Sequence, residues 1–145
     1  MVSCGAPVYR DRASFVPELP GLLADSGRLE LVTGPSSETL GEDFRFRFSG
    51  GHTPGLMLTE VDTLQGPLLF AGDLVPGIPW LHLPITMGYD RFPEQIVEEK
   101  RTVLHDLHAR DGMLFFTHDT EAAFVKVTRD EEGRFGGEPI PPPDG

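Results

Sequence analysis

The sequence GGHTPGLML, residues 50–58, places one histidine in a turn built largely of glycine and proline. Before the turn, FRFRF at 44–48 alternates apolar and basic residues, and after it LMLTEV at 56–61 forms a second apolar segment. Period-two alternation is typical of a β-strand with one buried face, so the stretch predicts two strands joined by a short connection. His52 then lies in a stiff turn at the end of a strand. It is either an ordinary polar turn residue or a ligand, and a metal ligand would need partner ligands elsewhere in the chain.

Two further apolar segments also lead into a residue that binds metals in proteins. PLLFAG at 67–72 leads into Asp73, and MLFFT at 113–117 leads into His118. Each of these residues, taken alone, is more often an ordinary turn residue than a ligand. With His52 they make two imidazoles and one carboxylate, a set that suits a divalent metal such as zinc.

The directions of the expected strands bring these residues to one edge of the sheet. The strands at 44–48, 56–61 and 67–71 follow one another through short connections and are antiparallel neighbours, so the first and third point the same way. The helix expected after Pro93 is a crossover that makes 113–117 parallel to 67–71. Crevices beyond the carboxyl ends of strands are where α/β folds place their sites.

The rest of the sequence outlines a single partial domain spanning 1–145. Residues 1–13 are expected to be irregular, residues 14–128 to form the folded core, and the Gly- and Pro-rich residues 129–145 to be a flexible tail. The core is expected to open with a short helix and a strand at 28–32.

A long proline-rich loop, residues 72–92, separates the third strand from the helix. Loops of this length are usually functional or disordered, and the apolar content of this one argues against disorder. Its candidates for contacting a substrate are Trp80, His82 and Tyr89, although a solvent-facing position is the competing interpretation for His82.

Composition limits the partners. The formal net charge of −11 argues against nucleic acid, because phosphate binding needs a basic surface. No apolar run approaches the roughly 20 residues of a membrane span. The single cysteine, Cys4, excludes an internal disulfide and fits a reducing compartment. We therefore expect a cytoplasmic protein that acts on a small-molecule substrate, without nucleic acid or membrane.

The three motifs together resemble a known family. GHTPG at 51–55, FAGD at 70–73 and THD at 117–119 resemble, in order and spacing, the successive C-terminal motifs of the metallo-β-lactamase fold. The resemblance covers roughly residues 15–128, and the long loop is similar to that of lactonase-like hydrolases. It implies an α/β fold with a mixed β-sheet and flanking helices, the C-terminal half of an αββα sandwich.

The resemblance also implies roles for individual residues. His52 would bind the first metal, Asp73 would bridge both metals as the catalytic carboxylate, and His118 would be the last ligand of the second metal. The cofactor implied is Zn²⁺, and the reaction is hydrolysis of a lactone or another ester- or amide-like carbonyl by a metal-bound hydroxide.

One hallmark of the family is missing from the sequence. The family's H-x-H-x-D-H run, which supplies two ligands to each metal, has no counterpart, and HDLH at 105–108 has the wrong spacing on an expected exposed helix flank. Leu56 also stands where the family usually has a further histidine. Each metal then keeps two ligands where a catalytic zinc has three. Whether the chain alone is an enzyme stays open against two alternatives: a non-catalytic remnant or oligomerising module, and a half-enzyme completed in trans by an N-terminal chain.

The apolar residues of the strands predict association. In a complete sandwich the inner face of this half is covered by the other half, so an isolated half exposes apolar surface. We expect either a homodimer or a complementary N-terminal half to cover a face that contains Phe44, Phe46, Phe48, Leu68, Phe70, Leu114 and Phe116.

Overall fold

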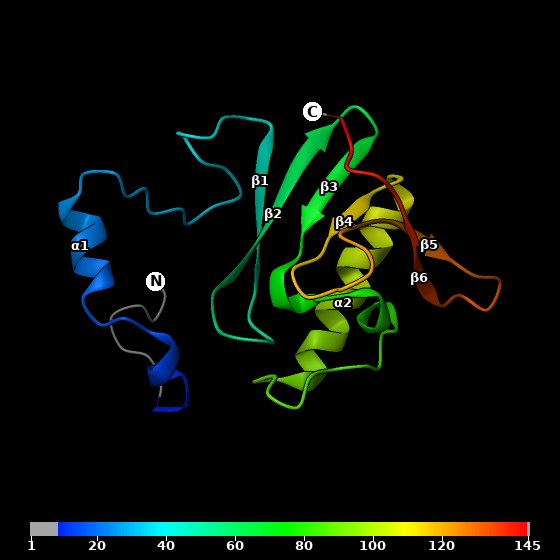
Figure 1. Cartoon of the computed structure of the whole chain (residues 1–145), viewed down its shortest axis with the longest axis horizontal. Helices are drawn as coiled ribbons and strands as arrows, with labels where there is room; N and C mark the ends of the chain where they lie inside the picture. Colours follow the sequence, from blue (N-terminus) through cyan, green and yellow to red (C-terminus); the bar gives the residue numbers. More distant parts are fainter. Residues whose placement is uncertain (1–8, 145) are drawn as a thin grey trace.

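The computed structural model describes residues 9–144, in which six strands form one mixed sheet in the order β1-β2-β3-β4-β5-β6 (Figure 1). The strands are β1 (Phe44–Ser49), β2 (Leu56–Thr63), β3 (Gly66–Phe70), β4 (Met113–Phe115), β5 (Phe124–Arg129) and β6 (Phe135–Pro139). Neighbouring strands are antiparallel except β3 and β4, which are parallel. Strands β1, β3 and β4 therefore point the same way, as the sequence predicts.

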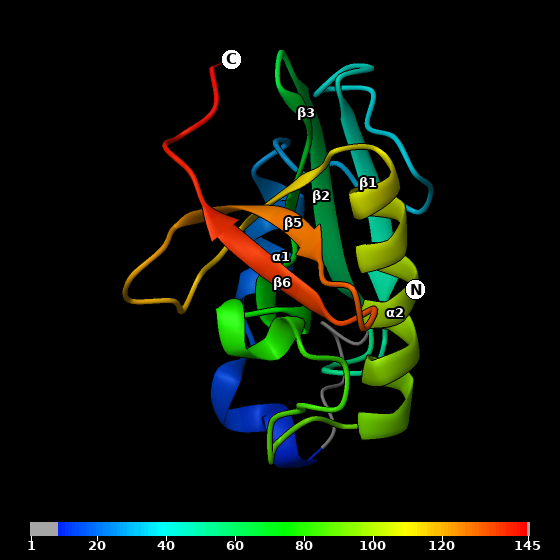
Figure 2. The same cartoon turned by 90° about the vertical axis from the view of Figure 1, so that its right-hand side faces the viewer.

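One long helix, α2 (Pro93–Ala109), packs on one side of this sheet (Figure 2). Proline at its first position leaves no helical hydrogen bond unmade, which is why the helix begins there. The chain turns back immediately after the helix at Gly112, where a Cβ would lie 2.8 Å from Leu107 Cδ2. None of the described helices is long and apolar enough to cross a membrane.

The core lies between α2 and the sheet. Register places Leu69, Leu114 and Val125 side by side in β3, β4 and β5, and all three are fully buried. The helix meets them with a buried stripe at helical spacing, made of Ile96, Lys100, Val103, Leu104 and Leu107. The apolar members of this stripe follow the sequence pattern, whereas Lys100 does not.

An ion-pair network joins the edge of the sheet to the end of α2. Glu60 of β2 is buried and accepts hydrogen bonds from Arg110 Nη1 and Nη2 at 2.9 and 2.8 Å. Arg47 of β1 also donates to Glu60, at 2.7 Å, and pairs with Asp106 of α2. Of the two basic residues of the FRFRF segment, Arg47 thus pairs with the helix, whereas Arg45 is exposed and pairs with Glu60 and Asp62 of β2.

The opposite face of the sheet is aromatic and only partly covered. Register aligns Phe70, Phe115 and Phe124 across β3, β4 and β5, with ring centroids 5.5 and 4.8 Å apart. We call the aromatic face the set Phe44, Phe48, Phe70, Phe115 and Phe124, none of which is fully buried. The short helix α1 (Leu19–Asp25) buries none of its residues and lies apart from this sheet (Figure 1).

This register corrects the sequence-based list of residues on the open face. Leu114 and Phe116 are buried on the α2 side, with 0% and 4% exposure. Phe46 shares the face of Phe44 and Phe48 but is itself buried there. Successive side chains of a strand point to opposite faces, so Phe115 rather than its two neighbours belongs to the aromatic face.

Two other expectations fail at the ends of the core. Residues 28–32 form no strand, and Leu31 is largely exposed, because this segment does not pair with the edge strand β1. The expected flexible tail contains β6, which pairs with β5 over five residues. Upstream, residues 9–14 form the 3-10 helix η1 (Tyr9–Ser14), and the rest of the expected irregular N-terminus, including Cys4, lies outside the described residues.

One aromatic residue anchors β6 despite the glycines around it. Phe135 is buried, and the rings of His105 and His108 approach it edge-on at 4.9 and 6.4 Å. The expected solvent-facing helix flank at 105–108 therefore packs partly against β6. The glycine-rich composition predicted a segment with too few side chains to pack. The segment packs nevertheless, because Phe135 is buried.

Candidate metal centre

The structure brings His52, Asp73 and His118 together at one edge of the sheet. His52 Nε2 lies 3.2 Å from Asp73 Oδ2, and His118 Nε2 lies 3.1 Å from Asp73 Oδ1. The three residues follow β1, β3 and β4, the strands that point the same way. Their role as metal ligands stays a prediction, but their convergence agrees with the strand-direction argument.

Asp73 is placed by a tight turn directly after β3. It belongs to the 3-10 helix η2 (Gly72–Leu74), in which Gly72 has φ +50°, a backbone conformation that favours glycine. The next residue, Leu74, is buried in the core and anchors the turn there. The carboxylate is left half-buried between the two imidazoles.

The other ring nitrogen of His52 contacts Asp90, a residue that is not among the candidates predicted from the sequence. His52 Nδ1 lies 2.8 Å from Asp90 Oδ1, and the other oxygen of Asp90 accepts a hydrogen bond from Met87 N at 2.7 Å. The Asp90 side chain is 1% exposed. The Gly-Tyr-Asp sequence that ends the long loop supported the family resemblance, and its aspartate carried the only signal for this contact.

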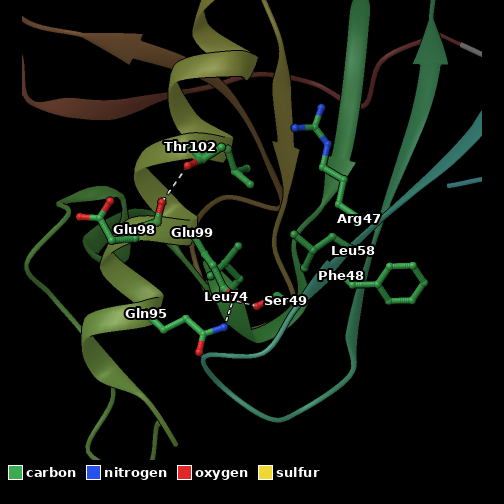
Figure 3. A pocket seen from close by; sticks show the side chains of 10 residues that line it. Arg47, Phe48, Ser49, Leu58, Leu74, Gln95, Glu98, Glu99 and Thr102 are labelled. Atoms are coloured by element: carbon green, nitrogen blue, oxygen red, sulfur yellow. Dashed lines mark hydrogen bonds between the residues drawn. The ribbon is translucent and has the colours of Figure 1, made fainter. Parts of the chain in front are cut away.

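The histidine turn is also fastened to α2 through Glu99 (Figure 3). Its carboxylate accepts hydrogen bonds from Ser49 Oγ at 2.6 Å, Gly50 N at 2.9 Å and Gly51 N at 3.2 Å. Burial raises the pKa of Glu99, but these bonds together with one from Gln95 outweigh it, so the pKa falls below its usual value. The turn is therefore bound to a carboxylate that stays ionised at neutral pH.

The loop after β4 is tied to the long loop. His118 N donates to Pro76 O at 3.1 Å, and Asp119 Oδ2 accepts a hydrogen bond from Ile78 N at 2.9 Å. The other oxygen of Asp119 caps the backbone of Glu121. His118 itself is the most open member of the group, with its side chain 64% exposed.

A pocket opens beside His118. It is lined by Ile78, Pro79, Trp80, His118, Asp119, Thr120 and Glu121. Of the residues proposed from sequence to contact a substrate, Trp80 lines this pocket, and the ring of Tyr89 meets that of His52 edge-on at 5.9 Å. The third, His82, has an exposed side chain and is not part of the lining.

The donor atoms suit zinc, although the arrangement is incomplete. In the part of the chain that the structure describes, no group of three or more His, Cys, Asp or Glu side chains is arranged to hold one metal ion. Each imidazole instead faces its own oxygen of Asp73. His52 nevertheless fits a ligand role, because the contact of Nδ1 with Asp90 leaves Nε2 facing Asp73.

Comparison with known proteins identifies the family. The sequence matches the metallo-beta-lactamase superfamily over residues 5–118. The chain belongs to the metallo-beta-lactamase superfamily. No curated protein matches it.

Solved structures of other proteins have a similar fold. The hydrolase AbOPH of the beta lactamase superfamily is 15% identical with a TM-score of 0.73, over 97% of this chain and 50% of its own. The dizinc quorum-quenching lactonase AidC, solved with the product N-hexnoyl-L-homoserine, is 21% identical with a TM-score of 0.68, over 94% and 46%. A probable metal-dependent hydrolase from Staphylococcus aureus is 19% identical with a TM-score of 0.66, over 81% and 42%.

These matches confirm the expected fold class. The chain is an α/β member of the metallo-beta-lactamase superfamily, with a mixed sheet and flanking helices. It spans about half the length of the solved structures it resembles.

Proposed function

We propose that this chain supplies His52, Asp73 and His118 to the metal site of a superfamily hydrolase. The observation that supports this most directly is the carboxylate of Asp73, which faces one histidine Nε2 with each of its oxygens. Asp73 would therefore hold metal together with both His52 and His118. Zinc, when bound, lowers the pKa of a coordinated water and polarises a carbonyl, which is the chemistry of hydrolysis.

The electrostatics of His52 also favour a cation between the side chains. A neutral imidazole has one N–H, so it can donate to Asp90 or to Asp73 but not to both. When Nδ1 donates to Asp90, the lone pair of Nε2 faces a carboxylate oxygen 3.2 Å away. The contact is then favourable only if the ring carries a second proton or a cation lies nearby.

The site needs further ligands. Counting Asp73 for both ions, each ion finds two protein ligands here, whereas a catalytic zinc has three besides its water. We infer that the remaining ligands come from a segment or partner that carries the H-x-H-x-D-H run. The described chain alone is expected to bind zinc weakly and to hydrolyse little.

The pocket beside His118 favours a neutral carbonyl compound as substrate. Ile78, Pro79 and Trp80 give it an apolar wall, and Asp119 and Glu121 give it negative charge, with no lysine or arginine in the lining. The lining itself therefore offers no side-chain cation to bind a carboxylate or phosphate, and an uncharged lactone or ester needs none. The solved lactonase AidC has a similar fold, which is compatible with this substrate class.

The second candidate function is a non-catalytic module that associates through its sheet. The observation that favours it is the aromatic face, which carries several incompletely buried phenylalanines on one side of the sheet. Two copies that stacked these faces would bury them, in the way that sheets pack in a sandwich. This candidate requires no metal.

Zinc titration separates the two candidates. By calorimetry at pH 7, the wild-type chain should bind Zn²⁺ weakly, and Asp73→Ala and His118→Ala should abolish that binding. His105→Ala is the matched control, because His105 is a histidine on α2 and should leave binding unchanged. Binding that survives Asp73→Ala would refute the proposed site, and stoichiometric zinc that resists a chelator would refute its incompleteness.

A further inference from the structure

A buried lysine of α2 holds the long loop from behind. Lys100 is 0% exposed and occupies a position in the apolar stripe of the helix. Its Nζ donates hydrogen bonds to three backbone carbonyls of the loop, at 3.0 Å to Trp80 O, 3.2 Å to His82 O and 2.6 Å to Ile85 O. All three N–H bonds of the ammonium are used on one short segment.

The same segment is held at its other end by a carboxylate. Trp80 belongs to the 3-10 helix η3 (Ile78–Leu81), whose first N–H donates to Asp119 Oδ2 at 2.9 Å. The approach is close, since a Cβ on Gly77 would lie 2.9 Å from the same oxygen. Asp119 follows His118 directly, so this end of η3 is fixed to the candidate metal centre.

The two charges match the polarity of the helix between them. The N-terminus of a helix presents unsatisfied N–H groups and its C-terminus unsatisfied carbonyls. The carboxylate of Asp119 accepts from an N–H at the first end, and the ammonium of Lys100 donates to carbonyls at the second end. Between these two attachments, Ile78, Pro79 and Trp80 line the pocket, and Trp80 has the largest side chain of the three.

We propose that Lys100 and Asp119 clamp η3 at its two ends and thereby position Trp80 as the wall of the pocket beside His118. Both are positioning residues, because each acts through η3. The inference rests on the proposed function only in taking that pocket as the one that receives the substrate. The clamp itself requires no metal.

The burial of Lys100 supports a specific role for its ammonium group in holding the loop. Burying an ammonium costs free energy, and a methionine would fill the same place in the stripe without that cost. Burial lowers the pKa of Lys100 to about 8, against the opposing charge of Asp90. At pH 6.5 the group is therefore an ammonium with three N–H donors, one for each of the three carbonyls.

The chain contains reporters for this clamp. Trp80 is its single tryptophan, and Lys100 and Lys126 are its two lysines. We expect Lys100→Met at pH 6.5 to raise the acrylamide quenching constant of Trp80 about twofold and to shift its emission to longer wavelength, because the wall segment then opens locally. Lys126→Met, which removes a lysine paired with Asp111, should leave both unchanged.

A second variant tests the other end of the clamp, and a stability control separates local opening of η3 from general destabilisation. Asp119→Asn places an amide where the carboxylate accepted Ile78 N, and it should expose Trp80 in the same way even if Lys100→Met does not fold. Leu58→Ala removes a buried side chain of β2 and should lower the unfolding midpoint without changing Trp80 quenching in the native state. Quenching that is unchanged in folded Lys100→Met and Asp119→Asn, or that rises equally in Leu58→Ala, would overturn the clamp.

The outcome is distinguishable from failure of the proposed function. If the wild-type chain binds no Zn²⁺ while Trp80 shielding still depends on Lys100, the metal proposal is wrong and the clamp stands. If Zn²⁺ binds as expected and shielding is independent of Lys100, the clamp is wrong and the metal proposal stands.

Discussion

At the scale of single residues, Gly51 determines how closely the histidine turn approaches α2. A Cβ at this position would lie 2.8 Å from both Cδ1 and Cγ1 of Ile96 and 2.9 Å from its backbone nitrogen. We expect Gly51→Ala to lower the free energy of unfolding by about 1–3 kcal/mol, because turn or helix has to shift. Urea denaturation measures this. Gly21→Ala is the control: its Cβ meets nothing within 4 Å in α1, so it should be neutral or stabilising, and equal effects would contradict the close approach.

Asp90 orients His52 from a distance of 38 residues along the chain. Residues that hold the second nitrogen of a metal-binding histidine typically contribute 10- to 100-fold in metal affinity, so Asp90→Ala should weaken Zn²⁺ binding by about that factor. Calorimetric titration against wild type tests it. Asp62→Ala, which removes an exposed carboxylate of β2, serves as the control, and an Asp90→Ala variant that bound Zn²⁺ like wild type would show that His52 needs no such partner.

At the scale of elements, Glu99 joins the β1–β2 turn to α2. Because its ionised form accepts hydrogen bonds from Ser49, Gly50 and Gly51, Glu99→Gln should cost about 1–2 kcal/mol of unfolding free energy at pH 7. Glu98→Gln, on the exposed side of the same helix, should cost little.

The pH dependence of this effect has a definite sign. The folded pKa of Glu99 lies below the ordinary value of 4.5, so its stabilising contribution is complete above that value and is lost as the pH falls through the folded pKa. The difference in unfolding free energy between wild type and Glu99→Gln should therefore shrink as the pH is lowered from 7 to 3. A difference that stayed constant over this range would contradict the assignment.

Strand β6 depends on one side chain for its attachment. Phe135 is 7% exposed, contacts the ring of His105, and lies 5.5 Å from the guanidinium carbon of Arg129. Phe135→Ala should lower the free energy of unfolding by about 3 kcal/mol, since it removes a large buried aromatic. Thermal or urea unfolding measures this, with the exposed Leu64→Ala as the control. If Phe135→Ala lowered the free energy of unfolding by less than about 0.5 kcal/mol, Phe135 would not be what attaches β6 to the fold.

At the scale of the whole molecule, the aromatic face predicts association. Exposed apolar area costs on the order of 25 cal/mol per Å², and several incompletely buried phenylalanine rings on one face favour a partner. We expect sedimentation of the isolated chain to show a dimer or larger species, and Phe124→Asp to shift it toward the monomer. Leu64→Asp, at the exposed β2–β3 turn, should not. A wild-type monomer with a cooperative melt would contradict this.

The sequence by itself determined strands β1 to β5, helix α2 and the order of the site residues along the sheet edge. Period-two alternation predicted β1, and helical spacing predicted α2, since each pattern depends only on residues close in the chain. Chain order and connection length then fixed the strand directions. His52, Asp73 and His118 followed from these local facts together with the family motifs.

Only the tertiary structure decided which side chains support that site. Nothing in the neighbourhood of Glu99 or Lys100 along the chain indicates that they meet the histidine turn and the long loop. For Asp90, the only signal of its contact with His52 was the Gly-Tyr-Asp sequence. The position of a loop without regular structure depends on its contacts with packed elements that are distant in the chain. The same reason explains β6: glycine-rich composition lowers the local preference for structure, and burial of Phe135 between α2 and the sheet supplies the free energy that composition lacks.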